Sequence, residues 1–482
     1  MSAATASSDT RQEIARIFAL QQKNAPAVGL SPIHDRIKKL KNFRAALNDP
    51  AWFNALAEAM HLDFRKHPVE AYASEVGTTT SYIDHICKNL YRWLSPHKEI
   101  TPLPLLGITS YLQCEPKGQV LIISPWNYPV LLAFCPLVNA IAAGNTVVLK
   151  PSEMTAHTSA FIRAFLAGLF DEKEVAVVEG DAETATALLE LPFHHIHFTG
   201  SPAVGKIIMA AAARNLTTIT LELGGKSPAI VTPSADIALT AQKMAWAKHF
   251  NNGQTCIAPD YAVIHESVLD PFIQHYKKAL TRYFNSDGKG IQQSDSLPRV
   301  INLKHFKRIH SLLEDALDKG AKVAVGGQSD EKDLYIEPAV ILHVDESMNI
   351  MDEEIFGPLL PVVTYREVSE IPAIINRRPK PLALYIAGKK RKEIRYLLQH
   401  TTAGNTIIND YLLGFSNPHL PMGGVNNSGM GRSLGFAGFR EFCNERSVMD
   451  RRFLSSGLKL VFPPYGKRAN FVLRWLYRLI NY

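Results

Sequence analysis

One cysteine of this sequence lies in a setting that favours covalent chemistry. The run HFNNGQTCIAPDY, residues 249–261, leads from a helix-like stretch through two asparagines and a glycine to Cys256, and then into a strand. A cysteine at such a turn can be exposed and close to backbone N–H groups, and both conditions favour a reactive thiolate. Most free cysteines are instead small buried hydrophobes, so only its neighbours make Cys256 a candidate nucleophile.

Two polar residues elsewhere in the chain could assist such a nucleophile. Glu222 ends the apolar part of LELGGKSP, and a glutamate desolvated at a lobe junction has the raised pKa of a general base. Asn127, in SPWNYP, follows a predicted strand, and a side-chain amide there can donate a hydrogen bond to an oxyanion. The alternatives are an exposed or helix-capping glutamate and an asparagine that satisfies turn backbone.

A turn with two glycines is the candidate for binding a phosphate-bearing cofactor. FTGSPAVGK follows a strand and opens a helix, so Gly200 and Gly205 would let the backbone approach a pyrophosphate. Its GxxxxGK spacing matches a P-loop, but residue 207 is Ile where magnesium binding needs Ser or Thr, which excludes a kinase or ATPase. Lys150 and Glu153, in KPSE after another strand, could hold ribose hydroxyls or be exposed loop charges.

Three neighbouring histidines, His194, His195 and His197, have the look of a metal-binding cluster. Alternation along a strand would put His195 and His197 on one face and His194 on the other. Neither cysteine nor carboxylate partners occur at ligand spacing. We therefore expect packing or hydrogen-bonding histidines and no metal site.

The elements that must position these residues follow an α/β pattern. Helical periodicity covers residues 14–22 and 35–60. Beyond them, short apolar runs alternate with helix-like segments, which predicts a parallel sheet covered by helices on both faces, the architecture of nucleotide-binding domains. The predicted strands are 119–124, 145–150, 175–180, 196–200 and 218–225.

A second α/β region begins near Gly225. Its predicted strands SPAIV, YAVIHE, AKVAVGG, PAVILHV and LPVVTY alternate with helices such as FKRIHSLLEDALDKG, which Gly320 would cap. A proline-rich segment leaves the first lobe as an extended arm. The expected division is a cofactor domain of residues 1–95 and 114–224, a catalytic domain of 225–430, bridging elements of 96–113 and 431–455, and a basic amphipathic tail of 456–482.

Length, charge and cysteine content fit a two-lobed intracellular protein. A chain of 482 residues exceeds the size at which single cores stop growing. Its five cysteines include no CxxC pair, which favours free thiols in a reducing compartment, and the N-terminus lacks a secretory pattern. The net charge of +7 is a small excess on so long a chain and does not predict nucleic-acid binding. We expect a cytoplasmic protein.

The C-terminal tail has a pattern of its own. In KRANFVLRWLYRLINY, Arg474 and Arg478 stand four residues apart beside apolar residues, so a helix here would carry a basic stripe and a broad apolar face. No stretch of the chain reaches the roughly 18 uninterrupted apolar residues of a membrane span. We expect this tail to pack on the fold or on another subunit, with peripheral contact to a membrane surface as the alternative.

Seven motifs, in their order and approximate spacing, resemble the aldehyde dehydrogenase superfamily, and most closely its class three and fatty-aldehyde branch. They are NNGQTC, LELGGKSP, SPWNYP, KPSE, FTGS with Gly205, EEIFGP and PMGGVNNSGMGR. The resemblance implies an α/β fold with a Rossmann-like cofactor domain, a second α/β catalytic domain and a small extended oligomerisation arm. It also implies a homodimer.

The resemblance further implies roles for individual residues. Cys256 would be the nucleophile, Glu222 the general base, and Asn127 an oxyanion donor together with the Cys256 N–H. The residues implied for binding NAD and/or NADP are Trp126, Lys150, Glu153, Gly200, Ser201, Val204, Gly205, Glu354 and Phe356. The negative charge of Glu153 would repel a 2′-phosphate and so favours NAD, while class three relatives often use both cofactors.

The implied reaction is oxidation of a medium or long-chain aliphatic, or an aromatic, aldehyde to its carboxylic acid through a thiohemiacetal and a thioester. A hydrolase is one rival, because a thiolate and an oxyanion donor also cleave esters. A CoA-acylating enzyme fits less well, since Glu222 is present to direct water to the thioester. A non-catalytic protein built on the same fold is the third alternative, and the intact trio of candidate residues argues against it.

Overall fold

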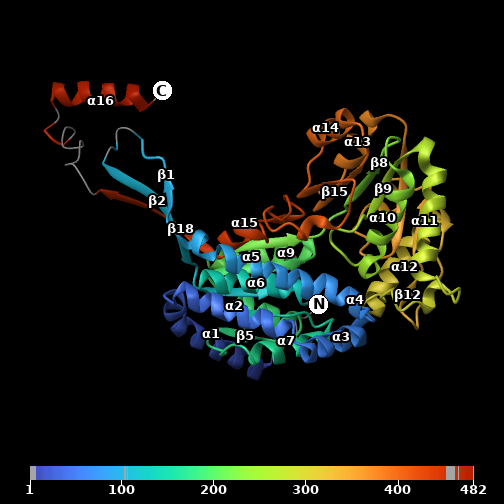
Figure 1. The fold of residues 1–482 in the computed structure, drawn as a ribbon, viewed down its shortest axis with the longest axis horizontal. Helices are drawn as coiled ribbons and strands as arrows, with labels where there is room; N and C mark the ends of the chain where they lie inside the picture. The colour runs from blue at the N-terminus through green and yellow to red at the C-terminus, as the bar shows by residue number, and fades with distance from the viewer. Residues whose placement is uncertain (1–6, 103–104, 106, 452–461, 465, 481–482) are drawn as a thin grey trace.

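Two α/β lobes and a projecting sheet make up the chain in the computed structural model, which describes residues 7–102, 105, 107–451, 462–464 and 466–480 (Figure 1). A six-stranded sheet forms the centre of the first lobe. Its strands are, in order across the sheet, β17 (Gly429–Met430), β7 (Thr218–Leu223), β6 (His195–Gly200), β3 (Gln119–Ile123), β4 (Thr146–Lys150) and β5 (Val175–Val177). The predicted parallel sheet is confirmed for β3 to β7, and β17 joins it antiparallel.

The register of this sheet brings the chemistry-bearing residues to one edge. Ile123 pairs with both Lys150 and Phe198, and Phe198 pairs with Leu221, so the carboxyl ends of four parallel strands are level. Ligands of open α/β sheets bind outside these carboxyl ends. Asn127 and Glu222 therefore start from the same edge of the sheet.

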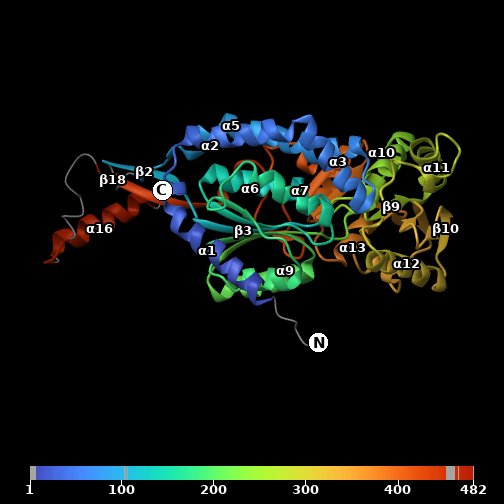
Figure 2. The ribbon, with the colours of Figure 1, turned by 90° about the horizontal axis from the view of Figure 1, so that it is seen from below.

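Helices cover both faces of the first sheet, as its continuous apolar strands require. Val120 and Ile122 pack into the core on the side of α6 (Leu131–Ala143) and α7 (Ala156–Ala167). Leu121 and Ile123 face the other side, where α1 (Ser8–Gly29), α8 (Ala182–Leu189) and α9 (Pro202–Arg214) pack. Figure 2 shows α6 above the sheet and α9 below it.

Residues 35–60, predicted as one helical stretch, form two helices, so that prediction is wrong. The N-terminal elements after α1 are α2 (Ile33–Leu47), α3 (Pro50–Phe64), α4 (Pro68–Ala71), the π-helix η1 (Tyr72–Val76) and α5 (Gly77–Leu94). The side chain of Asp49 accepts a hydrogen bond from the N–H of Ala51, and Pro50 occupies the first helical position. Both features start a new helix.

A seven-stranded sheet forms the second lobe. Its strands are, in order, β10 (Lys322–Val325), β13 (Ala339–Leu342), β14 (Leu359–Tyr365), β9 (Tyr261–His265), β8 (Pro228–Val231), β15 (Ala383–Ala387) and β16 (Asn405–Ile408), and all but β10 pair in parallel. The helices are α10 (Ile237–His249), α11 (Leu269–Phe284), α12 (Leu303–Asp318), α13 (Ile371–Asn376) and α14 (Arg391–His400). Gly320, with a φ of +100°, follows the end of α12 as predicted.

Short elements complete the lobe. They are the strands β11 (Ser329–Asp330) and β12 (Tyr335–Ile336), and the 3-10 helices η3 (Phe250–Gly253), η4 (Glu266–Val268), η5 (Ile291–Gln293), η6 (Asn349–Met351), η7 (Val368–Glu370) and η8 (Leu413–Phe415). Because β17 pairs with β7, the chain is already back in the first sheet at residue 429, slightly before the boundary expected at 430.

A three-stranded antiparallel sheet projects from the first lobe (Figure 1). It contains β1 (His97–Glu99), β2 (Ile108–Pro116) and β18 (Cys443–Arg451), and the short helix α15 (Gly435–Arg440) leads into it. β1 and the start of β2 lie in the arm predicted for residues 96–113, of which 103, 104 and 106 lie outside the described residues.

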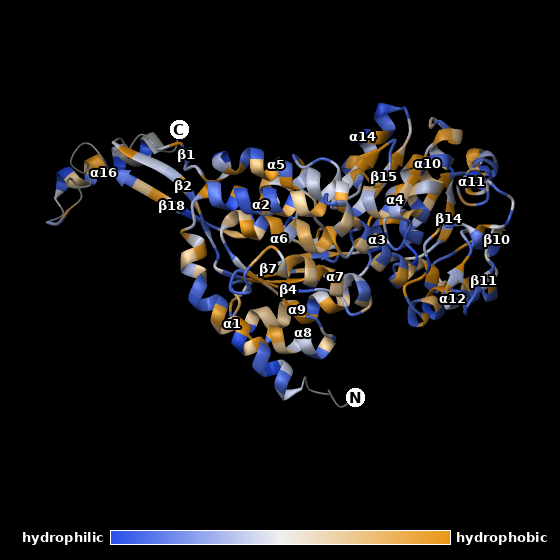
Figure 3. Ribbon diagram, turned by 60° about the horizontal axis from the view of Figure 1, so that its bottom comes forward, coloured by the Kyte–Doolittle hydropathy of each residue, from blue (hydrophilic) through white to orange (hydrophobic). Residues whose placement is uncertain are grey.

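The tail contains the helix α16 (Lys467–Ile480), which lies beyond the projecting sheet. Hydrophilic and hydrophobic residues mix along it (Figure 3), and the side chains of Phe471 and Trp475 are exposed. Residues 452–461, 465 and 481–482 of the expected bridging element and tail lie outside the described residues. Among the described residues, no helix is both long enough and apolar enough to cross a membrane.

Candidate active site

A left-handed turn carries the candidate nucleophile between α10 and β9. Asn251, Asn252 and Gly253 have φ values of +54°, +56° and +74°. A Cβ on Gly253 would lie 2.3 Å from the carbonyl oxygen of Gly357, so only glycine fits there. This tight turn directs Cys256 to the junction of the two lobes.

Cys256 is partly exposed, and its surroundings favour the thiol over the thiolate. Cys256 is partly buried, and this burial raises the pKa of its thiol. The negative charges of Glu354 and Glu222 raise the pKa further, while the N–H groups of Cys256 and Ile257 lower it. A thiol with a raised pKa needs a proton acceptor nearby before it can react as a thiolate.

Glu222, on β7, has the properties of such an acceptor. Its side chain is buried, and burial raises the pKa of its carboxyl to about 8. The hydroxyl of Ser433 donates a 2.5 Å hydrogen bond to the Glu222 Oε1 and lowers that pKa in part, as does the charge of Arg432. The alternative of an exposed glutamate is excluded. Ser433 was not predicted, because nothing near Glu222 in the sequence indicates it.

Asn127 is fixed against the turn that carries Cys256. Its Nδ2 donates to the carbonyl oxygen of Gln254 at 3.0 Å, and the Nδ2 of Asn251 donates to the carbonyl oxygen of Asn127 at 2.9 Å. An amide nitrogen carries two hydrogens, so the second N–H of Asn127 remains for another acceptor. The side chain does more than satisfy its own turn.

Cys256 lies between two cavities. The first, of about 360 Å³, which we call the junction cavity, is lined among others by Trp126, Asn127, Gly200, Ser201, Glu222, Cys256, Glu354 and Phe356. The second, of about 260 Å³, which we call the apolar cavity, is lined by Cys256 and mainly by Tyr128, Leu131, Leu132, Trp246, Phe250, Ile257, Leu412, Leu413 and Phe415. Eight of the twelve predicted site residues therefore line one cavity, and Lys150, Glu153, Val204 and Gly205 do not.

The N-terminus of α9 faces the junction cavity. Gly200, Ser201 and Pro202 line it, and the Ser201 hydroxyl caps the helix by accepting from the N–H of Val204 at 3.4 Å. Such a terminus favours a bound anion. The N–H of Gly205 donates to the Ser201 carbonyl, and a Cβ there would lie 2.9 Å from Leu223, so this glycine allows close helix–strand packing.

Lys150 and Glu153 bind each other at the end of β4. The Lys150 Nζ lies 2.8 Å from the Glu153 Oε2, with the lysine side chain buried and the glutamate side chain 44% exposed. Both the ammonium and the carboxylate can exchange this contact for a hydroxyl group of a ligand.

The segment containing Glu354 and Phe356 forms another wall of the junction cavity. Burial raises the pKa of the Glu354 carboxyl to about 8. A Cβ on Gly224 would lie 2.1 Å from the Glu354 Oε2, so the glycine after the Glu222 strand makes room for this carboxylate. The ring of Phe356 meets that of Trp126 edge to face, with centroids 5.3 Å apart.

The three histidines act as hydrogen-bonding and packing residues, as predicted. His194 accepts a hydrogen bond from the N–H of Gln119, and the Nδ1 of His195 lies 2.8 Å from the hydroxyl of Thr218. Burial lowers the pKa of His197 to about 3, and its ring stacks on Phe442.

Comparison with known proteins gives one answer. The model of the aldehyde dehydrogenase family matches residues 2–448. The chain is 42% identical over 438 residues to 4,4'-diaponeurosporen-aldehyde dehydrogenase of Staphylococcus aureus, covering 91% of this chain and 93% of the relative. It is 42% identical over 417 residues to aldehyde dehydrogenase family 3 member B1 of Mus musculus, covering 86% and 87%.

A solved structure described as the substrate-bound state of Staphylococcus aureus AldH superposes with a TM-score of 0.91 at 40% identity, covering 96% of this chain and 99% of that one. The motifs, the fold and these relatives agree. The chain belongs to the aldehyde dehydrogenase family, in which its relatives include the class three members.

Proposed function

We propose that this aldehyde dehydrogenase oxidises an apolar aldehyde to the carboxylic acid with NAD and/or NADP, through a thiohemiacetal and a thioester on Cys256. One observation carries the proposal. Cys256 is the point at which a cavity that also contains Glu222 and Asn127 meets a second, apolar cavity. A nucleophile, a base and an oxyanion donor thus share one site with separate places for two reactants.

The walls of the junction cavity fit a nicotinamide dinucleotide. The N-terminus of α9, capped by Ser201, suits its pyrophosphate, and the buried carboxylate of Glu354 suits a ribose hydroxyl. Phe356 and Trp126 supply flat apolar surfaces. Lys150 and Glu153 can hydrogen-bond to the hydroxyls of the second ribose. The bound cofactor supplies the hydride acceptor that no amino-acid side chain can supply.

The chain's own residues account for the covalent steps. Loss of the thiol proton to Glu222 leaves the Cys256 thiolate, which attacks the aldehyde carbonyl carbon. The free N–H of Asn127 and the N–H of Cys256 donate to the oxyanion, a contribution of about 3 kcal/mol per donor in other enzymes. Glu222 passes the thiol proton to solvent, and after hydride loss its carboxylate takes a proton from water, which attacks the thioester. The acid leaves and the thiolate returns.

The apolar cavity indicates the class of substrate. Its walls are mainly aliphatic and aromatic side chains, so the chain or ring of an aldehyde gains free energy by leaving water. The Staphylococcus aureus relative is named for 4,4'-diaponeurosporen-aldehyde. We place the apolar part of the aldehyde in this cavity, with its carbonyl at Cys256.

The projecting sheet supports a further proposal, that the chain forms a homodimer. Among the described strands, β1 and β18 are the outer strands of this sheet and each pairs with β2, and a second copy can extend a sheet at an outer strand. Sedimentation equilibrium measures the mass. A monomer at micromolar concentration would contradict the proposal.

Substitution of the nucleophile tests the proposed reaction. In Cys256→Ala, NADH production from decanal should fall to background, while the dinucleotide still binds, measured by quenching of tryptophan fluorescence. The buried Cys135→Ala is the matched control and should retain activity. Sustained NADH production by Cys256→Ala would refute the assignment, and ester cleavage without any NADH production in the wild type would favour a hydrolase.

A further inference from the structure

The segment from Lys66 to Val76 has no part in the mechanism described above, yet it buries ionisable groups at the lobe junction. Lys66 and Glu75 are fully buried, and Glu70 is partly buried. Burying charge is costly unless each group is paired. The partners of these three residues therefore indicate what the segment does.

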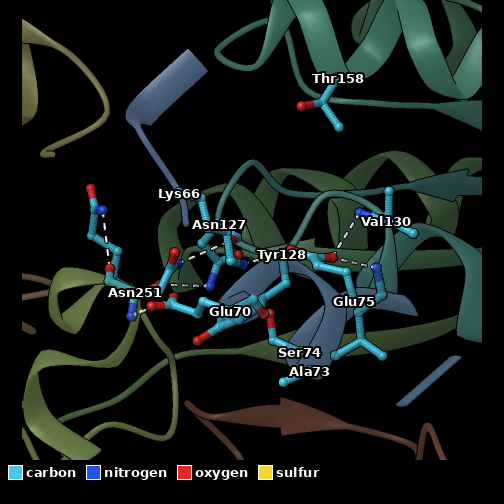
Figure 4. Close-up of polar contacts among 12 residues, drawn as sticks. Lys66, Glu70, Ala73, Ser74, Glu75, Asn127, Tyr128, Val130, Thr158 and Asn251 are labelled. Atoms are coloured by element: carbon cyan, nitrogen blue, oxygen red, sulfur yellow. Dashed lines mark hydrogen bonds and ion pairs between the residues drawn. The ribbon is translucent and has the colours of Figure 1, made fainter. Parts of the chain in front are cut away.

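Glu75 and Lys66 hold the part of the chain that follows Asn127. The Glu75 Oε1 binds the Lys66 Nζ at 2.8 Å, and its Oε2 accepts from the N–H groups of Val130 and Leu131 at 3.1 and 2.8 Å (Figure 4). These N–H groups begin α6 and have no partner in their own helix. The loop that presents Asn127 is fixed at its C-terminal end by one carboxylate.

Tyr128 extends this contact toward the nucleophile. The Lys66 ammonium lies 4.2 Å from the centre of the Tyr128 ring, close enough for a cation–π interaction. The Tyr128 hydroxyl is 2.6 Å from the hydroxyl of Thr255, the residue before Cys256. The Asn127 loop and the nucleophile turn are thus joined through side chains of both.

Glu70 holds the nucleophile turn itself. Its Oε1 accepts from the N–H of Asn251 at 2.9 Å, and Figure 4 shows the two residues side by side. Asn251 and Asn252 both adopt the left-handed conformation, which asparagine tolerates better than other residues with a side chain. The hydrogen bond that the Asn251 N–H donates to Glu70 holds this turn from the other lobe.

The π-helix explains how one short segment reaches both partners. Residues five apart, such as Glu70 and Glu75, lie about 140° apart around an α-helix. A π-turn closes its hydrogen bonds from i to i+5 and brings such residues toward the same side. The turn at Tyr72–Val76 thereby lets both carboxylates face the lobe junction.

We propose that Glu70 is a positioning residue for aldehyde oxidation: its carboxylate fixes the turn at residues 251–253, and this turn sets the Cys256 N–H and thiol opposite Asn127. The inference rests on the proposed function, in which Cys256 is the nucleophile. Glu75 sets one side of the oxyanion site and Glu70 sets the other.

The charge of Glu70 gives this role a pH dependence. Burial raises the pKa of its carboxyl to about 7, the charge of Lys66 and the hydrogen bond from Asn251 lower it, and the charge of Glu75 raises it. The phenol of Tyr128 also interacts with this carboxyl. A carboxylate accepts a hydrogen bond more strongly than a carboxylic acid, so the turn is held more firmly above about pH 7.

Three variants test the proposal. Glu70→Ala removes the acceptor and should lower kcat by about tenfold or more while KM for decanal changes less than about twofold. Glu70→Gln keeps a neutral acceptor, so its kcat should lie between that of the wild type and that of Glu70→Ala. The pH profile of its kcat should lose the rise near pH 7. Glu58→Gln, on the exposed face of α3, is the matched control and should match the wild type.

Alkylation of Cys256 by iodoacetamide, followed by mass spectrometry of its peptide, supplies a readout that does not need turnover. The rate of Cys256 alkylation in Glu70→Ala should fall in proportion to kcat. Thermal unfolding followed by circular dichroism verifies that the variant is folded. An unchanged alkylation rate and kcat in Glu70→Ala, or a wild-type pH profile in Glu70→Gln, would overturn the proposal. Retained activity in Cys256→Ala would overturn the proposed function instead, so the two failures are distinguishable.

Discussion

The ammonium nitrogen of Lys226 lies 2.6 Å from a carboxylate oxygen of Asp260, and this buried pair supports the loop that carries Glu354. The Lys226 Nζ also donates to the carbonyl of Glu353 at 3.0 Å. The other oxygen of Asp260 accepts from the N–H of Ile355 at 3.0 Å. One ion pair therefore connects the segment after Glu222, the segment after Cys256 and the wall of the junction cavity.

Lys226→Met should weaken both the fold and cofactor binding. It leaves Asp260 buried without its counter-ion, a change that costs about 3 to 5 kcal/mol in comparable pairs. The expected result is a lower Tm and a higher Kd for NAD, measured by thermal unfolding with and without cofactor. Lys390→Met breaks the more exposed pair with Glu393 and should cost less than about 1 kcal/mol. Equal effects of the two substitutions would contradict this interpretation.

Ser433→Ala should shift the pH dependence of turnover upward. The hydrogen bond from Ser433 lowers the pKa of Glu222, so its loss should raise that pKa above about 8. A base must be ionised to act, and the rise of kcat should move to higher pH. Steady-state rates across a pH series give the midpoint. Ser447→Ala, exposed on β18, provides the control, and a midpoint that stays constant or falls would refute the assignment.

Glu222→Gln should stabilise the fold at alkaline pH. The pKa of Glu222 is raised in the folded state from 4.5 to about 8, so the folded chain binds more protons than the unfolded chain between these values. The contribution of Glu222 to the free energy of unfolding therefore falls as pH rises through this window. Denaturant titrations near pH 5 and pH 8.5 should show a larger gain for Glu222→Gln at the higher pH. An equal gain at both would count against the raised pKa.

Leu413→Lys should select against long aldehydes. Leu413 lines the apolar cavity and is 46% exposed, so a charge here would stand beside the far end of a long substrate. We expect kcat/KM for decanal to fall about tenfold, and that for propanal to change less than about twofold, because its chain is too short to reach. Leu30→Lys, on an exposed leucine far from the cavity, is the control. An equal loss of kcat/KM for decanal and propanal would show that the apolar cavity does not hold the chain of the aldehyde.

Local sequence patterns predicted the parallel strands and the edge at which Asn127 and Glu222 meet, because both follow from strand ends. The break between α2 and α3 could also have been predicted, because Asp49 and Pro50 form a helix start signal. Apolar periodicity alone does not detect it. The contacts of Ser433 with Glu222 and of Glu70 with Asn251 could not be predicted from the sequence. Each of these contacts spans many residues, and no motif indicates it.

Some properties of the site depend on neighbours in space. The sequence did not predict the close contact that Gly205 allows with Leu223. Burial and two nearby carboxyls oppose the charge of the Cys256 thiolate. The candidate role of a residue could be inferred from motif spacing, whereas the pKa of its side chain depends on the groups that surround it in the fold.

The pairing of Gly429 with Glu222 has a consequence for how the protein is made. A chain leaving the ribosome completes β7 long before β17, so the strand that carries Glu222 has an open edge while the whole second lobe is synthesised. Ser433 follows only then, 211 residues after its partner. The buried carboxyl of Glu222 consequently acquires its hydrogen-bond partner only after the whole second lobe has been synthesised.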